Sequence, residues 1–304
     1  MPPSVEPTVQ QPTVFVPAGL PSPVLTQATT SRAPSDDATL ALALLNRGGG
    51  AVGGELRQSF FGGQLRLSYQ VQRDVITGSA VALEALIRLA HRERGLLTPA
   101  EFLPEAESLR VMHEIDAWVL QRVCQDGAWL LSRGCTVDLA LNTTATQLSR
   151  PGFVGAVEEE VRKAGLPAGM LTLEIGALDA LAHLASVRAV ADALPRRGVR
   201  LSVGDVSPGR RSPHHLRQIT LGELKLDRAF IARLTGDDAD VAGEELRELV
   251  WAARDLGARV VAEGIETPQQ YEVAAAAFCD RGQGFLLGRP APLEQVAALV
   301  TARA

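Results

Sequence analysis

Short apolar segments alternate with longer segments of helical apolar spacing along most of the chain. Positions 65, 67, 69 and 71 are apolar with polar residues between them, which predicts a half-buried strand. A turn at 74–78 leads directly into a second apolar run at 80–86. These two strands are expected to be antiparallel, because parallel neighbours need a long crossover connection.

After this hairpin the pattern predicts a strand followed by a helix, several times over. The later strands are expected at 136–141, 171–175, 199–203, 223–226, 259–262 and 284–287. The helices are expected at 109–133, 152–164, 178–196, 239–256, 268–278 and 292–302. Such alternation over about 240 residues is typical of a (β/α)8 barrel. The sequence therefore predicts an α/β fold, a TIM-like barrel with an antiparallel first strand.

The composition along the chain predicts a division into three regions. Residues 1–36 hold eight of the 18 prolines and almost no charge. Such a segment buries too little surface to offset its ordering entropy, so a disordered N-terminal tail is expected. Residues 37–62 form a helical and glycine-rich lead-in around GGGAVGG at 48–54. The barrel domain is expected to occupy residues 63–304.

Charge and composition narrow the class of protein. The net charge of −5 argues against a bulk nucleic-acid binder, which normally has a basic face. No apolar run approaches the roughly 20 residues of a membrane helix, and the N-terminus lacks a signal-peptide pattern. Cys124, Cys135 and Cys279 form no C-x-x-C pair, which favours a reducing cytoplasm over a disulfide framework or zinc knuckle.

Most of the apolar strands end on a carboxylate, an amide or a lysine. These side chains are Glu84, Asn142, Glu174, Asp205, Lys225, Asp227, Glu263 and Gln283. A barrel brings the carboxyl ends of its strands to one rim, so we expect them to meet there. Hard divalent ions prefer oxygen ligands, and lysine stabilises charge developing on a phosphoryl group. The alternative for any single residue is a helix cap or a surface ion pair.

Four segments resemble motifs of the EAL family in order and spacing. They are LEALIRLAHRERGLLTPAEFLPEAE (83–107), LKLDRAFI (224–231), VVAEGIET (260–267) and GQGFLLGRP (282–290). That family comprises cyclic-di-GMP phosphodiesterases and their inactive relatives. The resemblance extends from about residue 63 to the C-terminus. It implies a barrel that hydrolyses cyclic-di-GMP to the linear dinucleotide with two Mg²⁺ or Mn²⁺ ions.

The resemblance also implies a role for each matching residue. Glu84, Asn142 and Glu174 would bind the first metal ion, and Asp205 would bind the second. Lys225 and Glu263 would orient and activate the attacking water. The remaining implied ligand-binding residues are Arg88, which would contact a phosphate, together with Asp227 and Gln283.

Two departures from the family pattern weaken the expectation of hydrolysis. Gly204 stands where the family has an aspartate that bridges both metal ions, and Ala177 replaces a glutamate that steadies the following loop. Two divalent ions about 4 Å apart repel by on the order of 16 kcal/mol at an effective dielectric near 20. Without the shared carboxylate, the paired-metal site is expected to be weak.

The loop after this position is also unusual. Residues 207–215 read SPGRRSPHH, which is stiffened by two prolines and rich in basic side chains. One interpretation makes Arg210, Arg211 and His214 a replacement phosphate clamp, because guanidinium can substitute for metal charge. The other is a solvated basic loop. Adjacent His214 and His215 are disfavoured as metal ligands, since neighbouring side chains in an extended segment point apart.

Three functions remain open from the sequence. The first is a degenerate EAL domain that binds cyclic-di-GMP or a protein partner without turnover. The second is a working metal-dependent phosphodiesterase, and the third is a protein-interaction scaffold that ignores the nucleotide. The helix at 239–256 carries Val241, Leu246, Leu249 and Val250, which form either a homodimer face or part of the core.

Overall fold

The computed structural model describes residues 63–91 and 94–301. The predicted disordered tail (1–36) and the predicted lead-in (37–62) lie outside the described residues. The described part forms a nine-stranded sheet in the order β1-β9-β8-β7-β6-β5-β4-β2-β3, and β1 also pairs with β2. That extra pairing closes eight strands into a barrel, with β3 outside the ring. The predicted TIM-like barrel is confirmed.

The strands that form the sheet are short except for the first two. They are β1 (Leu65–Asp74), β2 (Ala80–His91), β3 (Gly95–Leu97), β4 (Asp138–Asn142), β5 (Leu171–Gly176), β6 (Val199–Val206), β7 (Glu223–Leu226), β8 (Arg259–Ala262) and β9 (Arg281–Gln283). Strand β1 is antiparallel to both β2 and β9, and β3 is antiparallel to β2. The successive pairs from β2–β4 to β8–β9 are all parallel. The predicted antiparallel first strand is therefore confirmed.

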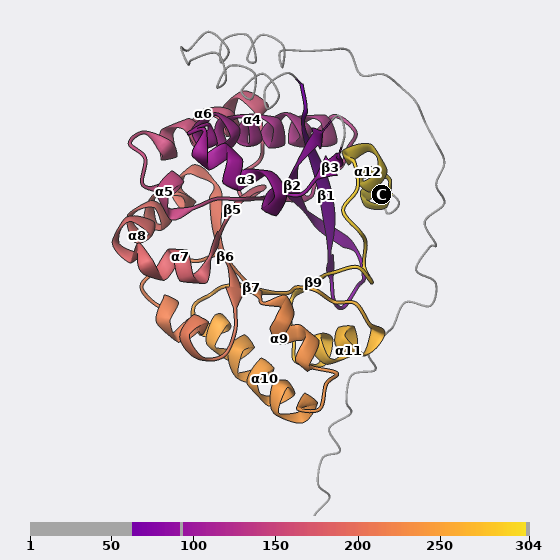
Figure 1. Ribbon diagram of the computed structural model, residues 1–304. Coiled ribbons are helices and arrows are strands. Elements are labelled where there is room, and N and C mark those ends of the chain that lie inside the picture. Colours follow the sequence, from indigo (N-terminus) through magenta and orange to yellow (C-terminus); the bar gives the residue numbers. More distant parts are fainter. Residues whose placement is uncertain (1–62, 92–93, 302–304) are drawn as a thin grey trace, which may run out of the picture.

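Helices surround the strands (Figure 1). They are α3 (Pro99–Ser108), α4 (Met112–Leu131), α5 (Ala145–Leu148), α6 (Phe153–Ala164), α7 (Ala177–Ala182), α8 (Leu184–Ala193), α9 (Arg228–Arg233), α10 (Ala239–Asp255), α11 (Pro268–Ala276) and α12 (Leu293–Thr301). Short 3₁₀ turns occupy Pro195–Arg197, Gly209–Arg211 and Pro213–Leu216. No described helix is long and apolar enough to cross a membrane.

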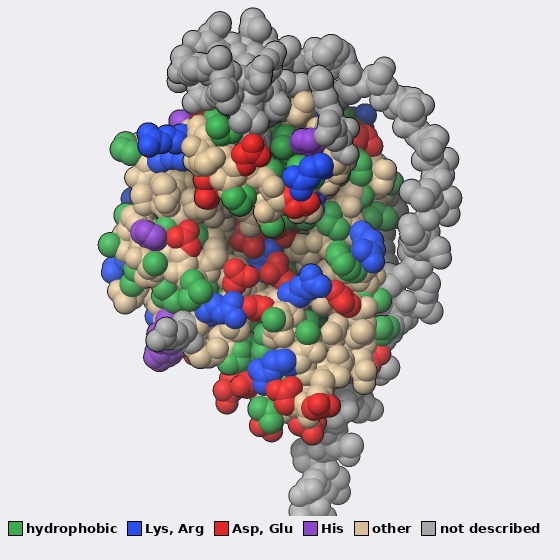
Figure 2. Space-filling view, in the orientation of Figure 1, with side chains coloured by type: hydrophobic (Ala, Val, Ile, Leu, Met, Phe, Trp, Pro, Cys, Tyr) green, Lys and Arg blue, Asp and Glu red, His purple; other side chains and the backbone are tan. Residues whose placement is uncertain are grey.

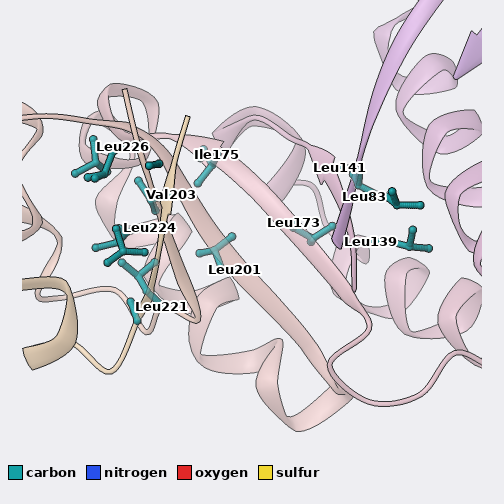
Figure 3. Packing of buried hydrophobic residues seen from close by; sticks show 14 of the residues in the cluster. Leu83, Leu139, Leu141, Leu173, Ile175, Leu201, Val203, Leu221, Leu224 and Leu226 are labelled. Carbon is teal, nitrogen blue, oxygen red and sulfur yellow. The ribbon is translucent and has the colours of Figure 1, made fainter. Parts of the chain in front are cut away.

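The main apolar core lies between the strands and the helices (Figure 3). Leu83, Leu139, Leu173, Leu201 and Leu224 come from five neighbouring strands and are at most 2% exposed. Successive side chains of a strand point to opposite faces. Because these leucines point outward to the helices, the polar residues next to them point into the barrel. The apolar pattern of the sequence thus sets which side chains face the barrel interior.

Strand β1 differs from the half-buried strand predicted from its alternation. Its polar residues Ser68, Gln70 and Gln72 are also buried, at 8%, 9% and 1% exposure. They face the interior of a closed barrel rather than solvent. The alternating pattern of a single strand does not distinguish a polar barrel interior from water.

The last strand was predicted in the wrong place. The sequence predicted a strand at 284–287, whereas β9 is Arg281–Gln283 and the apolar run after it forms a turn. Gly284 lies against the backbone of Ile265, where an added Cβ would come within 2.1 Å of the Ile265 carbonyl oxygen. The strand itself carries polar inward residues, so apolar periodicity missed it.

Some helix predictions also need correction. The helix predicted at 109–133 begins at Met112, because Arg110 has a left-handed φ of 56°. The helix predicted at 178–196 is divided at His183 into α7 and α8. Elements β3, α3 and α9 were not predicted.

The candidate dimer face on α10 belongs mainly to the core. Leu246, Leu249 and Val250 are at most 5% exposed, and Val241 is the exposed member of the four residues at 55%. The core interpretation of this helix therefore holds for three of the four residues.

Charged side chains close the barrel at the amino ends of its parallel strands. Asp138 Oδ2 accepts hydrogen bonds from Arg200 Nη1 at 2.9 Å and Arg281 Nη2 at 2.6 Å, with Arg259 Nη1 at 3.3 Å. Arg281 Nη1 also contacts Glu223 Oε2 at 3.3 Å. These five residues come from β4, β6, β7, β8 and β9, so the cluster ties five strands together.

We expect Asp138→Asn to destabilise the barrel by about 1–2 kcal/mol. This is less than for a fully buried ion pair, because Arg200 and Arg259 are partly exposed to solvent. Burial alone would raise the pKa of Asp138, but the hydrogen bond from Arg281 and three arginine charges hold the pKa below its usual value. The stabilisation is therefore present above the unfolded pKa of about 3.9 and is lost as the pH falls through the lower folded value.

Urea unfolding of wild type and Asp138→Asn at a series of pH values measures this effect. The control is Glu158→Gln, which removes an exposed ion pair with Arg197. Equal unfolding midpoints for wild type and Asp138→Asn at neutral pH would show that this cluster does not stabilise the barrel.

Candidate active site

Six of the predicted polar side chains meet inside the opposite, carboxyl-end mouth of the barrel. They are Glu84 on β2, Asn142 on β4, Glu174 on β5, Lys225 on β7, Glu263 directly after β8, and Gln283 on β9. Hydrogen bonds and ion pairs join all six into one network. In Figure 2, acidic side chains surround a basic one in the hollow at the centre of the face.

Lys225 is the centre of this network. Its Nζ lies 2.7 Å from Glu84 Oε2, 2.7 Å from Glu174 Oε2 and 2.6 Å from Glu263 Oε1. The lysine side chain is 0% exposed. An ammonium group has three N–H donors, so one carboxylate is available for each donor of Lys225.

The electrostatics keep this lysine charged. Burial alone would lower the pKa of Lys225, but the carboxylates of Glu174, Glu263 and Glu84 outweigh burial and raise the pKa well above its usual value. A buried charge is tolerated only when it is paired and hydrogen-bonded, and here every donor has a partner. Lys225 therefore acts as a fixed internal cation.

The three carboxylates are affected unequally. Burial would raise the pKa of Glu84, but the charge of Lys225 and three hydrogen bonds hold it below its usual value. Burial raises the pKa of Glu174 well above its usual value and also raises that of Glu263. Three carboxylates share one ammonium group, so a bound proton or a second cation would reduce the excess negative charge among them.

Amide groups complete the inner surface next to Glu84. Asn142 Nδ2 donates to Glu84 Oε1 at 2.9 Å, and Gln283 Nε2 donates to Glu84 Oε2 at 2.7 Å. Gln283 also contacts Gln70 and Gln72 on β1, at 3.1 Å each. Sequence reasoning missed these two glutamines, and their only signal was a polar residue at every second position of β1.

A cleft opens from this network toward the surface. It is lined by Gln70, Glu84, Leu86, Arg228, Glu263, Gly264, Glu266, Gln283, Gly284 and Phe285. Arg228 Nη2 donates to Glu266 Oε1 at 3.0 Å, and the Phe285 ring is 43% exposed. The cleft therefore combines a polar floor with an outer wall that is aromatic and cationic. The polar residues at the strand ends did not predict this outer wall.

Three further predicted residues lie around the rim. Arg88 is half-buried on β2, and burial lowers its pKa while the nearby charge of Glu84 opposes this. Asp205 is exposed on β6 with a left-handed φ of 56°, which aspartate tolerates better than most residues. Asp227 caps α9 by accepting from Ala229 N, and its other oxygen lies 2.6 Å from Arg211 Nη1.

The two positions that depart from the family pattern are close to the network. A Cβ at Gly204 would lie 2.8 Å from Glu174 Oε1, so a side chain at this position would point at the site carboxylates. Gly204 pairs with Gly176 across β5 and β6. Ala177 begins α7 and is fully buried, and its methyl group offers no hydrogen bond to the loop.

The described basic side chains of the loop after β6 have different surroundings. His214 and His215 are exposed, and their ring centroids are 6.0 Å apart at nearly a right angle. Arg211 contacts Asp227, as described above. Among the residues that the structure describes, no group of three or more His, Cys, Asp or Glu side chains is arranged to hold a metal ion.

Glu84 and Glu174 are both paired with Lys225, so a hard divalent ion would have to share them with the ammonium group. Glu84 and Glu174 supply carboxylates and Asn142 an amide beside them, which are the oxygen ligands that Mg²⁺ and Mn²⁺ prefer. Burial raises the pKa of Glu174 even though the charge of Lys225 lowers it. Gly204 offers no side-chain oxygen beside Glu174.

Comparison with known proteins identifies the family. A model of the EAL domain family matches residues 54–290. The chain belongs to the EAL domain family. The resemblance predicted from four sequence motifs is thus confirmed.

Curated relatives of this EAL domain are longer proteins. The bifunctional diguanylate cyclase/cyclic di-GMP phosphodiesterase MucR of Pseudomonas aeruginosa is 35% identical over 247 residues, covering 81% of this chain and 36% of MucR. The cyclic di-GMP phosphodiesterase NbdA of the same organism is 35% identical over 240 residues, covering 79% of this chain and 30% of NbdA. The chain therefore spans about a third of the length of these relatives.

Solved structures agree with the fold. The phosphodiesterase structure of MucR in complex with c-di-GMP has a TM-score of 0.73 and 35% identity, covering 80% of this chain and 98% of that one. The EAL domain of FimX from Pseudomonas aeruginosa, bound to c-di-GMP, has a TM-score of 0.71 at 21% identity, covering 80% and 97%. The second similarity shows the fold alone.

We expect Lys225→Met to destabilise the domain by roughly 3–5 kcal/mol at neutral pH, because three buried carboxylates lose their common cation. Those carboxylates then have folded pKa values above their unfolded values. The penalty should grow as the pH rises above about 4 and shrink as the pH is lowered and the carboxyl groups take up protons.

Urea unfolding between pH 4 and pH 8 measures this dependence. Lys163→Met is the matched control, since Lys163 is exposed and pairs with Glu160 on the surface of α6. An unchanged midpoint for Lys225→Met, or a penalty that grows on acidification, would contradict the central role of this ammonium group.

Proposed function

We propose that this EAL domain is a signalling module that binds cyclic-di-GMP and hydrolyses it weakly or not at all. The observation that carries the proposal is Gly204, where a side chain would meet Glu174 Oε1 but where the glycine provides no carboxylate. The surrounding network of Lys225, Glu84 and Gln283 is complete. The site thus keeps the groups that bind a phosphodiester and lacks one that a metal pair shares.

Several features support binding of the nucleotide. The cleft offers amide and guanidinium donors for polar groups of the ligand, and Phe285 and Leu86 offer apolar surface for its bases. Arg88 is four residues beyond Glu84 on the same face of β2, where its guanidinium can meet a phosphate. The MucR structure with 35% identity was solved with c-di-GMP bound.

In this proposal Glu84, Asn142 and Glu174 hold a single Mg²⁺ or Mn²⁺, which when bound would polarise a phosphate oxygen. Lys225 keeps Glu84 ionised and holds Glu263 in place. Glu263 is the group of the three with a partly exposed side chain, at 21%, so it is placed to orient a water molecule. These roles of the residues remain predictions.

An active phosphodiesterase is the second candidate function. The similarity to NbdA and MucR favours it, as does the retention of Lys225 and Glu263 in contact. Water or a ligand phosphate would then have to replace the carboxylate missing at Gly204. A scaffold that ignores the nucleotide is the remaining outcome.

The boundaries and the setting of the domain are also part of the proposal. We assign residues 63–304 to the barrel domain, with 1–36 as a tail and 37–62 as a lead-in. The thiols of Cys124, Cys135 and Cys279 are free and buried, which favours a reducing cytoplasm. A protein partner or a homodimer would act through surfaces other than the core residues of α10.

Titration with cyclic-di-GMP in a calorimeter and chromatography of the products test the function. We expect the wild type to bind, and to form little or no linear dinucleotide with excess Mn²⁺. Arg88→Ala should weaken binding roughly tenfold or more, because a charged hydrogen bond to phosphate is lost. Arg94→Ala is the control, since Arg94 pairs with Glu101 on the surface.

Rapid formation of the linear dinucleotide would favour the active enzyme. Absence of heat at high ligand concentration would favour the scaffold. Either result would refute the proposed function.

Gly204→Asp tests why turnover is weak. We expect this variant to bind Mn²⁺ more tightly, because a carboxylate is added beside Glu174, yet to hydrolyse cyclic-di-GMP slowly. Ala177 and the altered loop remain, and the Glu174 side chain must shift to admit any Cβ at position 204. Calorimetry with Mn²⁺ and product chromatography supply the two measurements.

Gly204→Ala is the matched control, since it adds the Cβ without the oxygens. Fast hydrolysis by Gly204→Asp alone would show that the missing bridging aspartate is the whole defect.

A further inference from the structure

The loop between β6 and β7 brings an arginine to the mouth of the barrel. Arg211 ends the 3₁₀ turn Gly209–Arg211, and its Nη1 lies 2.6 Å from Asp227 Oδ2. Asp227 follows Lys225 by two residues in extended backbone, so it continues the inward-facing row above the lysine. The guanidinium is therefore held at the rim, on the side of β6 and β7.

The rest of the loop holds this arginine in position. The Ser207 backbone N–H donates to the Arg211 carbonyl oxygen at 3.4 Å. Leu216 and Ile219, which follow in the loop, are buried in the core at 0% and 4% exposure. A loop packed in this way orders Arg211 before any ligand arrives, which lowers the entropic cost of binding.

On this side of the mouth, Asp205 is the exposed carboxylate left for a second metal ion. Asp227 Oδ1 accepts from Ala229 N at 2.6 Å, and Oδ2 is paired with Arg211, so both of its oxygens are engaged. Gly204 supplies no oxygen. The guanidinium group of Arg211 already supplies a positive charge in this region.

Arg211 has capacity for another partner. A guanidinium group carries five N–H donors in a planar fork that matches two oxygens of a phosphate. The ion pair with Asp227 involves one nitrogen, and the arginine side chain is 31% exposed. Its charge also offsets Asp227, which would otherwise repel an anionic ligand.

We propose that Arg211 binds a phosphate of the phosphodiester ligand and replaces the charge of the second metal ion. This assignment rests on the proposed binding of cyclic-di-GMP. It makes a distinct claim, namely that binding does not require a divalent ion. A guanidinium group cannot deliver a metal-bound water, so the same replacement leaves the ligand bound but not hydrolysed.

The test is calorimetric titration with cyclic-di-GMP in EDTA, and again with Mg²⁺, on the full-length protein. We expect the wild type to bind in EDTA, and Arg211→Gln to bind roughly tenfold to a hundredfold more weakly. Mg²⁺ should not restore the affinity of the variant. Arg217→Gln is the matched control, because Arg217 is an exposed arginine six residues further along the same loop.

Glutamine retains a hydrogen-bond donor for Asp227, so a role limited to holding the loop predicts wild-type affinity for Arg211→Gln. Arg211→Lys keeps the charge and should recover part of the affinity. The wild type should also lose affinity more steeply with added salt than Arg211→Gln does. Urea midpoints for all variants show whether the fold is retained.

Two failures can be told apart. If the wild type binds in EDTA and Arg211→Gln binds equally well, Arg211 is not a phosphate ligand, although the domain still binds the nucleotide. Binding that requires Mg²⁺ would also overturn the assignment. If the wild type binds no cyclic-di-GMP at all, the proposed function fails and this assignment fails with it.

Discussion

A single buried ammonium group determines how the mouth of this barrel is built. Closure of the strands forces their inward side chains together away from solvent, and three of these are glutamates. Isolated charges in such a place are too costly, so they must be neutralised within the barrel. Lys225 does this by contacting residues from β2, β5 and the segment after β8 at once. Asn142 and Gln283 then donate to Glu84, one of the three carboxylates in that contact.

The barrel therefore has a polar interior and places its apolar core outside the ring. Many TIM barrels fill the interior with layers of branched apolar side chains. Here Asp138 and its arginines occupy one end, and Lys225 with its glutamates occupies the other. Both clusters join strands that are distant in sequence, so they contribute to the closure of the barrel as well as to its chemistry. Between them, Ser202 Oγ and Gln72 Oε1 are buried with no protein partner.

The sequence predicted the architecture well because two signals agreed. Apolar spacing located most strands and helices, and the polar residues at strand ends marked one rim. It failed where a strand is short and polar, as in β9, and where the meaning of alternation depends on closure, as for Gln70 and Gln72 on β1. The ring that turns those glutamines inward forms only when β1 pairs with β9, nearly 210 residues away along the chain.

Side-chain partners were the least predictable part of the site. The sequence indicated that Lys225 and the acids would meet, but not that one lysine would contact three carboxylates. It left the basic loop open between a phosphate clamp and a solvated segment. The structure places Arg211 of that loop on Asp227, a pairing that depends on the path of the 3₁₀ turns and not on any residue spacing.

The differences from the family pattern are consistent with one another. A site that uses two metal ions needs free carboxylates on the β6 and β7 side, and a site that uses a fixed cation needs those carboxylates removed or paired. Gly204 removes one and Arg211 pairs Asp227, which leaves Asp205 as the exposed carboxylate on this side. Under these two proposals, occupancy of the domain would follow the concentration of cyclic-di-GMP and would not require a divalent ion. The ligand would be released unchanged, which is the behaviour expected of a receptor.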